Sequence, residues 1–450
     1  MIGGTSQARD PAYVLLILSL LAWPYNNFPL LPGGSLRPLA FILMTALAGV
    51  TLAMAILRPG PFRLNIKLNK VDTSFLMMLA VYIIVTIIGW VGLEYNPMRL
   101  KEFPPFLRFA QSFTFVLISL MAYFTGKFAA KRLSFARFAG VMLVAFIPSL
   151  VVGLIQGLTV NGEFITKLSH VMTAADLPVG YYRAYLMTLE ASWAGFDVVV
   201  FVMPLTLYFY FQKPGPLFLG LFIVELLVLY FINSSGSFLL AAVLIALFII
   251  FSKKSAKTYL ALLLMMLLGV GWATFQPIMF ERLINVGQSL AVSDTIEESG
   301  ATRIISQQAS IEVFKENPLI GVGLRNFGYY YPLYIPDVYL KMPLFSEYAD
   351  PKERVMDVKS YFLDMLAATG LIGILFTGVF YARLANGLKQ IRARFPYEHR
   401  YIVIILLTAL AGGLSITLLG YPAYWIFLGY IAAFSQRSDS SCYQKAKEAS

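Results

Sequence analysis

Long apolar runs constrain this chain more than any other feature of its sequence. About twelve of them follow one another, at residues 12–31, 38–57, 73–93, 111–129, 138–158, 193–212, 216–233, 237–252, 258–278, 360–382, 401–420 and 422–436. Each is long enough, or nearly so, to cross about 30 Å of hydrocarbon as a helix. The chain is 58% hydrophobic and only 13% charged, whereas a soluble domain is about half apolar and about a quarter charged. We therefore expect an all-α polytopic integral membrane protein with about 12 transmembrane helices.

The polar residues are concentrated in one late segment. Residues 1–450 form a single integral membrane domain, into which a large loop at 277–359 is inserted between the ninth and tenth predicted spans. This loop is expected to contain helices of its own. Residues 437–450 form a polar tail.

The basic residues predict the orientation. They cluster in short connections, at Arg58, Arg63, Lys67, Lys70, Lys131, Arg132, Arg137, Lys253, Lys254, Lys257, Arg383, Lys389, Arg392, Arg394 and Arg400. Lys and Arg resist translocation, so these connections are expected to be cytoplasmic. Both termini are then cytoplasmic, and the two long loops, about 159–190 and 277–359, face outward.

The sequence lacks the motifs that indicate disulfides, metal sites or nucleotide binding. Cys442 is the only cysteine, so an internal disulfide is impossible. The outer loops show no carboxylate pair or His/Asp cluster at metal-binding spacing, and the chain has no Walker or dinucleotide glycine motif. We therefore expect no metal, no cofactor and no nucleic-acid partner.

The stretch Ala301–Phe327 carries the most chemistry in the large loop. Arg303 is expected on a helix that Thr302 or Ser299 caps and that ends near Glu316, because the residue before proline avoids the helical region. A glycine turn with Gly321 and Gly323 follows, and then Arg325. Two arginines and free backbone amides at a glycine turn suit a diphosphate. The alternative is an interfacial helix whose Arg303 faces water or lipid headgroups.

Three motifs in order resemble the O-antigen ligase and O-antigen polymerase superfamily. The first is Arg303 followed by the turn Asn-Pro-Leu-Ile-Gly-Val-Gly at residues 317–323 and by Phe327. The second is Ser360, nine residues, Gly370, two residues and Gly373; the third is the segment Arg183–Gly195. Lys359 stands where the ligases carry histidine.

The resemblance implies a membrane glycosyltransferase of polysaccharide or lipopolysaccharide biosynthesis in the bacterial inner membrane, with a periplasmic active site. It implies an inverting, metal-independent enzyme that uses an undecaprenyl-diphosphate-linked glycan as donor and a glycan or lipid as acceptor. The residues expected to bind the diphosphate are Arg183, Arg303, Arg325, Gly321, Gly323 and Ser360. Lysine at 359 favours a polymerase over a ligase that transfers glycan to lipid A core, and a charged Lys359 would bind phosphate.

Glu190 is the candidate general base. It follows Arg183 by seven residues, just before a predicted span, in an apolar setting that favours a raised pKa. The alternative is that Glu190 only forms a structural ion pair with Arg183. Asp357 and Asp364, which flank Lys359, are the next candidates.

Two acidic residues fall inside predicted spans and raise the possibility of transport. Asp197 and Glu225 have no basic partner in the spans. Acids within a membrane are costly and mark either function or a buried polar contact. We expect buried hydrogen bonds, and we keep a lipid-linked oligosaccharide flippase or transporter as the alternative class of function.

Overall fold

The computed structural model describes residues 10–26, 38–57, 68–94, 105–158, 184–188, 190–251, 298–336 and 357–437, and within these ranges it is helical and contains no strand. The helices are α2 (Pro11–Leu21), α3 (Leu39–Leu57), α4 (Lys70–Glu94), α5 (Pro105–Arg132), α6 (Phe135–Leu158), α8 (Ala191–Asp197), the π-helical turn η1 (Val198–Val202), α9 (Met203–Gln212), α10 (Pro216–Ile232), α11 (Ser235–Phe251), α14 (Glu298–Glu316), α15 (Phe327–Tyr330), the 3₁₀ turn η2 (Tyr331–Tyr334), α17 (Tyr361–Arg394), α18 (Pro396–Gly412) and α19 (Pro422–Phe434).

Membrane-spanning character is confirmed, while the count of 12 spans is not decided. Among the described residues, the helices long and apolar enough to cross a bilayer are Lys70–Leu93, Phe106–Arg132, Phe135–Leu158, Ala191–Gln212 and Tyr361–Arg394. Five shorter apolar helices, α2, α3, α10, α11 and α19, lie within or close to other predicted runs. The predicted span at 258–278 lies outside the described residues.

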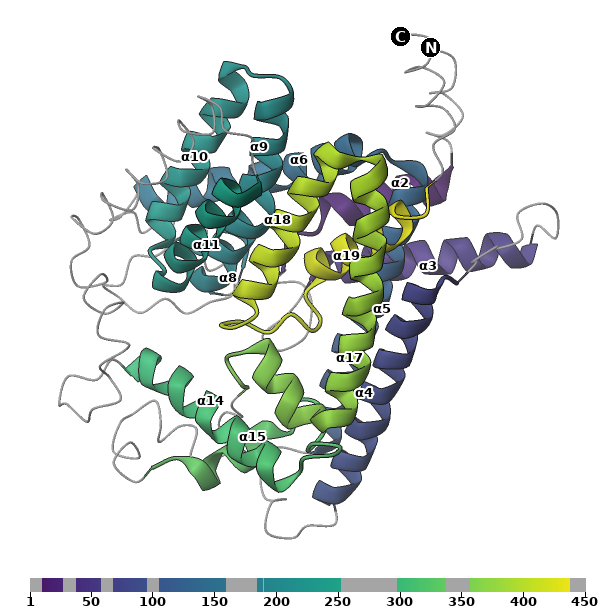
Figure 1. Ribbon diagram of the computed structural model, residues 1–450, viewed down its shortest axis with the longest axis vertical. Helices are drawn as coiled ribbons and strands as arrows, with labels where there is room; N and C mark the ends of the chain where they lie inside the picture. The colour runs from purple at the N-terminus through teal and green to yellow at the C-terminus, as the bar shows by residue number, and fades with distance from the viewer. Residues whose placement is uncertain are drawn as a thin grey trace.

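The long helices pack side by side. In Figure 1, α4, α5 and α17 run together, and α19 packs against α5. Two glycines allow this last contact: a Cβ on Gly126 would lie 1.8 Å from the Ile426 carbonyl oxygen, and one on Gly429 would lie 1.8 Å from that of Tyr123. Small residues that let backbones approach are a common device for joining helices in membranes.

The two acids inside the apolar helices make the buried hydrogen bonds that the sequence predicts. The Asp197 carboxylate accepts a hydrogen bond from the Tyr421 hydroxyl, and Glu225 accepts one from the Thr206 hydroxyl. Both acids are fully buried. The first bond joins α8 to the start of α19, and the second joins the consecutive helices α9 and α10. The second oxygen of each carboxylate is buried without a hydrogen-bond partner among the described residues.

The segment 298–336, which we call the loop unit, has a small hydrophobic core of its own. Ile305 and Val313 of α14 pack with Phe327 and Tyr331. The helix ends at Glu316, as predicted, but it begins at Glu298. The predicted N-cap positions, Ser299 and Thr302, were therefore wrong, because both residues lie inside the first turns of the helix.

A break in α17 joins the loop unit to the membrane helices. Gly370 adopts φ 59° and ψ −162°, which interrupts the helix. The chain at 318–323 runs along the break: the amides of Val322 and Gly323 donate to the carbonyls of residues 367 and 368, at 3.0 and 2.8 Å. The amides of residues 371 and 372 donate in return to those of 318 and 319, at 2.9 and 3.1 Å. Four backbone bonds thus replace those that the helix loses.

The break predicts a strong dependence on glycine at position 370. Replacing Gly370 with alanine should cost about 2 kcal/mol or more, because this backbone region is almost restricted to glycine and the Cβ would lie 2.5 Å from the Leu319 carbonyl. The apparent Tm of the purified protein in detergent should fall by several degrees. Gly378→Ala in the same helix is the control, because a Cβ there meets nothing within 4 Å. An equal Tm for the two variants would contradict this account.

Candidate functional site

Glu190, the candidate base, and Lys359, the other residue predicted to take part in catalysis, come together although they are far apart in the sequence. The Lys359 ammonium lies 3.9 Å from a carboxylate oxygen of Glu190. Both side chains reach solvent, with 35% and 45% of their surface exposed. Glu190 therefore faces a cation and water rather than an apolar setting, and its described ion-pair partner is Lys359.

Glu190 and Lys359 each stand just before a helix that begins at the same end of the bundle. Glu190 is the N-terminal cap residue of α8, in an extended conformation, and its carboxylate accepts a hydrogen bond from the Ser192 hydroxyl at 3.1 Å. Lys359 precedes Ser360, the cap residue of α17.

A third element, the loop 413–421 between α18 and α19, holds these parts in place. The amide of Tyr361 donates to the carbonyls of Gly413 and Ile416, at 2.7 and 3.1 Å. Arg303 of α14 donates to the Ser415 carbonyl at 3.1 Å. The loop 413–421 therefore connects the start of α17, beside Lys359, with the arginine of the loop unit.

Arg325 belongs to a charged cluster centred on Asp357, close enough to Lys359 for its charge to act on the Asp357 carboxylate. One oxygen of Asp357 accepts a hydrogen bond from Arg108 at 2.5 Å, and the other accepts one from Arg325 at 2.8 Å. Arg108 also donates to the Arg325 carbonyl at 2.9 Å. The Arg325 guanidinium lies 4.3 Å from the centre of the Phe115 ring, a cation–π contact. One carboxylate thus holds two guanidinium groups, and the cluster keeps an excess positive charge.

The electrostatics of this cluster follow from burial and charge. Burial lowers the pKa of Arg325 to about 10, an effect that Asp357 opposes and Arg108 reinforces. Enclosure by the surrounding chain raises the pKa of Asp357, although 37% of its side chain is exposed. The positive charges of Arg108 and Arg325 lower it more, so the pKa of Asp357 stays below its usual value. Arg325 also has φ 62°, an uncommon conformation for a residue with a side chain.

The other residues predicted to bind the diphosphate are engaged within the protein, buried or outside the described residues. The amide of Gly321 donates to the Asn317 carbonyl, and that of Gly323 donates to residue 368. These amides are used within the protein. Ser360 is buried, with 2% of its surface exposed, and Arg183 lies outside the described residues. Within the described ranges, no group of three or more His, Cys, Asp or Glu side chains gathers as metal ligands.

Comparison with known protein families finds one match. Residues 219–378 match a family described as O-antigen ligase. The match covers about a third of the chain. This confirms the resemblance to the ligase and polymerase superfamily, and it implies a membrane enzyme that transfers glycosyl groups. No curated protein matches the chain. The matched segment contains Arg303, Arg325, Lys359 and Ser360 but not Glu190, so the role of Glu190 rests on the geometry.

Sequence reasoning did not anticipate two parts of the site. Arg108 was visible only as a cation at the start of an apolar run, and its partner Asp357 lies 249 residues further along. The loop 413–421 contributes backbone carbonyls, and the pattern of side chains in a sequence does not predict such contacts.

The Asp357 cluster predicts a defined pH dependence of stability. Folding lowers the pKa of Asp357, so the ionised carboxylate stabilises the fold. This stabilisation is fully present at a pH above the pKa of an unfolded aspartate, about 3.9. It is lost as the pH falls through the lower pKa of the folded state. Asp357→Asn should lower the apparent Tm at pH 7, and the difference from wild type should shrink below about pH 4.

The exposed Glu316 of α14 provides the matched control. Glu316→Gln should leave the Tm nearly unchanged over the same pH range. A difference between Asp357→Asn and wild type that stays constant from pH 7 to pH 3 would contradict the assigned direction of the pKa shift.

Proposed function

We propose that this protein transfers or polymerises glycan from an undecaprenyl-diphosphate-linked donor on the periplasmic face of the inner membrane, as an inverting glycosyltransferase without a metal. The observation that carries the proposal is the contact between Glu190 and Lys359, a carboxylate and an ammonium group at 3.9 Å that both reach solvent. A proton acceptor and an anion-binding group side by side are what transfer from a diphosphate to a hydroxyl requires.

The reaction is a single displacement at the anomeric carbon. The acceptor hydroxyl oxygen forms a bond to that carbon while the bond to the diphosphate oxygen breaks. The proton of the hydroxyl passes to the Glu190 carboxylate, and the electron pair of the broken bond leaves with the lipid diphosphate. Lys359 and Arg303, with Arg183, stabilise the charge that develops on the leaving group.

Arg303 has donors to spare for this role. Its one described hydrogen bond uses one guanidinium nitrogen, on the Ser415 carbonyl. A guanidinium carries five N–H donors, so the bond to the loop 413–421 orients the side chain and leaves others for phosphate oxygens. Arg325, which is held by Asp357, contributes to the local positive potential rather than to direct contact.

Between the two activities of the superfamily we propose polymerisation. A neutral imidazole can accept a proton, whereas an ammonium group has three donors and no acceptor. Lys359 therefore acts on phosphate, and the proton transfer passes to Glu190. The ligase alternative, transfer to lipid A core, uses the same donor site and differs in the acceptor.

A flippase or transporter remains the alternative of another class. Its main sequence support was the pair of acids in the spans, and both accept hydrogen bonds from buried hydroxyls. A substrate path needs polar groups that face a cavity at mid-membrane. A position of Arg183 close to Arg303 would favour the enzyme over the transporter. Arg183 lies outside the described residues.

The base is tested by Glu190→Gln, which keeps size and hydrogen bonding but removes proton acceptance. We expect kcat to fall by about 10²–10⁴-fold with little change in the KM for the donor, measured on purified protein with polyprenyl-diphosphate glycan. Glu312→Gln is the control, because Glu312 also pairs with a lysine, Lys315, at 2.7 Å but on an exposed face of α14. A wild-type rate in Glu190→Gln would remove Glu190 as base.

The diphosphate contacts are tested by Arg303→Ala and Lys359→Gln. Each removes a charge-assisted hydrogen bond to the leaving group, and loss of one such donor costs about 10²–10³-fold in kcat. Lys359→Arg should retain more activity than Lys359→Gln, because it keeps the charge. Full activity in Arg303→Ala would contradict the proposal.

The acceptor is tested with wild-type protein alone. Supplying only the lipid-linked glycan should yield longer chains on the lipid. If product forms only when lipid A core is added, the protein is a ligase. Movement of the lipid-linked glycan across vesicle membranes without any new glycosidic bond would favour the flippase instead.

A further inference from the structure

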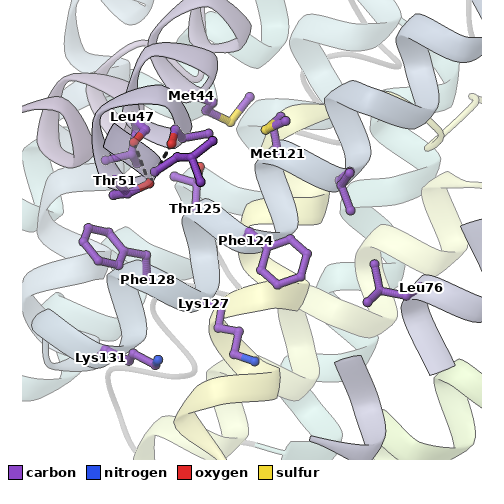
Figure 2. A pocket seen from close by; sticks show the side chains of 13 residues that line it. Met44, Leu47, Thr51, Leu76, Met121, Phe124, Thr125, Lys127, Phe128 and Lys131 are labelled. Atoms are coloured by element: carbon purple, nitrogen blue, oxygen red, sulfur yellow. Dashed lines mark hydrogen bonds between the residues drawn. The ribbon is translucent and has the colours of Figure 1, made fainter. Parts of the chain in front are cut away.

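A second site lies between α3, α4 and α5, on parts of the chain that the proposed reaction does not use. Here a cavity of about 540 Å³ is lined by apolar side chains, among them Met44 and Leu47 of α3, Leu76 of α4, and Met121 and Phe124 of α5. Figure 2 shows the two methionines near one end of this cavity and Lys127 and Lys131 at the other. A cavity of this size is within the range that binds small ligands.

The length of the cavity matches one leaflet of a bilayer. Its lining on α5 runs from Leu120 to Lys131. At 1.5 Å per residue these eleven steps cover about 16 Å of helix, and the hydrocarbon core of a bilayer is about 30 Å thick. An α5 that crosses the bilayer covers about half of the hydrocarbon over this distance. Because Lys131 is one residue from the end of α5, it would then lie at headgroup level.

The charge at that boundary is not balanced. Among the cations at the end of α5, Lys127 pairs with the buried carboxylate of Asp72, and Arg132 pairs with Asp10 at 2.6 Å. Lys131 is exposed, lines the cavity and has no carboxylate partner among the described residues. One unbalanced ammonium group thus lies at the mouth of an apolar cavity.

We propose that this cavity binds one anionic glycerophospholipid, with an acyl chain against α3 and α5 and the headgroup phosphate on Lys131. The leaflet is the one on the side that the basic connections predict to be cytoplasmic. A phospholipid fits better than a long polyprenyl chain, because the cavity covers only one leaflet. It fits better than a soluble anion, because most of the lining is apolar.

Lipid retention tests this directly. The full-length protein, purified in detergent, is titrated with dioleoyl phosphatidylglycerol, dioleoyl phosphatidylethanolamine or polyprenyl phosphate and examined by native mass spectrometry. Wild type should retain the anionic lipid in preference to the zwitterionic one. A basic group near the surface contributes about 1 kcal/mol to anionic-lipid binding, so Lys131→Gln should weaken retention of phosphatidylglycerol by about fivefold.

Two further variants separate charge from shape. Lys389→Gln, at an exposed cation on α17 that does not line the cavity, should retain the lipid as wild type does. Ala48→Phe, which places a ring in the cavity, should reduce retention of both lipids, and size-exclusion chromatography of the same samples establishes that it has folded. Lys131 also complements the C-terminal dipole of α5, but that role would change stability and not the preference between lipids.

Three results would overturn the proposal. Equal retention of the two lipids by wild type removes the headgroup contact. Equal loss in Lys389→Gln and Lys131→Gln reduces the effect to general surface charge. Binding of polyprenyl phosphate in place of phosphatidylglycerol means that the occupant is a different lipid.

Discussion

The hydrogen bonds between the chain at 318–323 and the break in α17 are the constraint on which the site depends. A membrane helix normally satisfies its own backbone, because lipid offers no partner for a free amide or carbonyl. At Gly370 it does not, and the turn of the loop unit supplies the missing partners. These backbone hydrogen bonds therefore fix the loop unit to the bundle, and they also fix where its charged side chains lie.

This connection changes the meaning of the glycine motif. Read as sequence, the glycines at 321 and 323 suggested amides that are free to bind a phosphate. In the fold, those amides donate to protein carbonyls, and a Cβ on Gly321 would lie 2.4 Å from the backbone of residue 368. The motif secures the loop unit to α17, so the proposed diphosphate contacts are assigned to side chains and not to these amides.

The sequence predicts the parts whose cause is local. Apolar runs predicted the helices, Asn317-Pro318 predicted the end of α14, and the absence of basic partners predicted hydrogen bonds for Asp197 and Glu225. Contacts across the fold were not predictable in the same way. The sequence offered Arg183 as the alternative ion-pair partner of Glu190 and did not indicate Lys359. The start of α8 meets the start of α17 only after the bundle has packed, and this brings Glu190 close to Lys359.

The break at Gly370 also changes where the boundary between the loop unit and the membrane helices is drawn. By hydropathy the loop ends at residue 359 and a membrane helix begins at 360. By packing, however, Ala367 and Val358 belong to the small core of the loop unit, and the carbonyls of residues 367 and 368 hold its turn. The first turns of α17 thus belong to both cores, because Tyr361, Met365 and Ala368 pack in the main core of the bundle while Ala367 packs in that of the loop unit. A fragment cut at residue 359 would lack one wall of its own core, and a soluble version of this segment has to extend past residue 368.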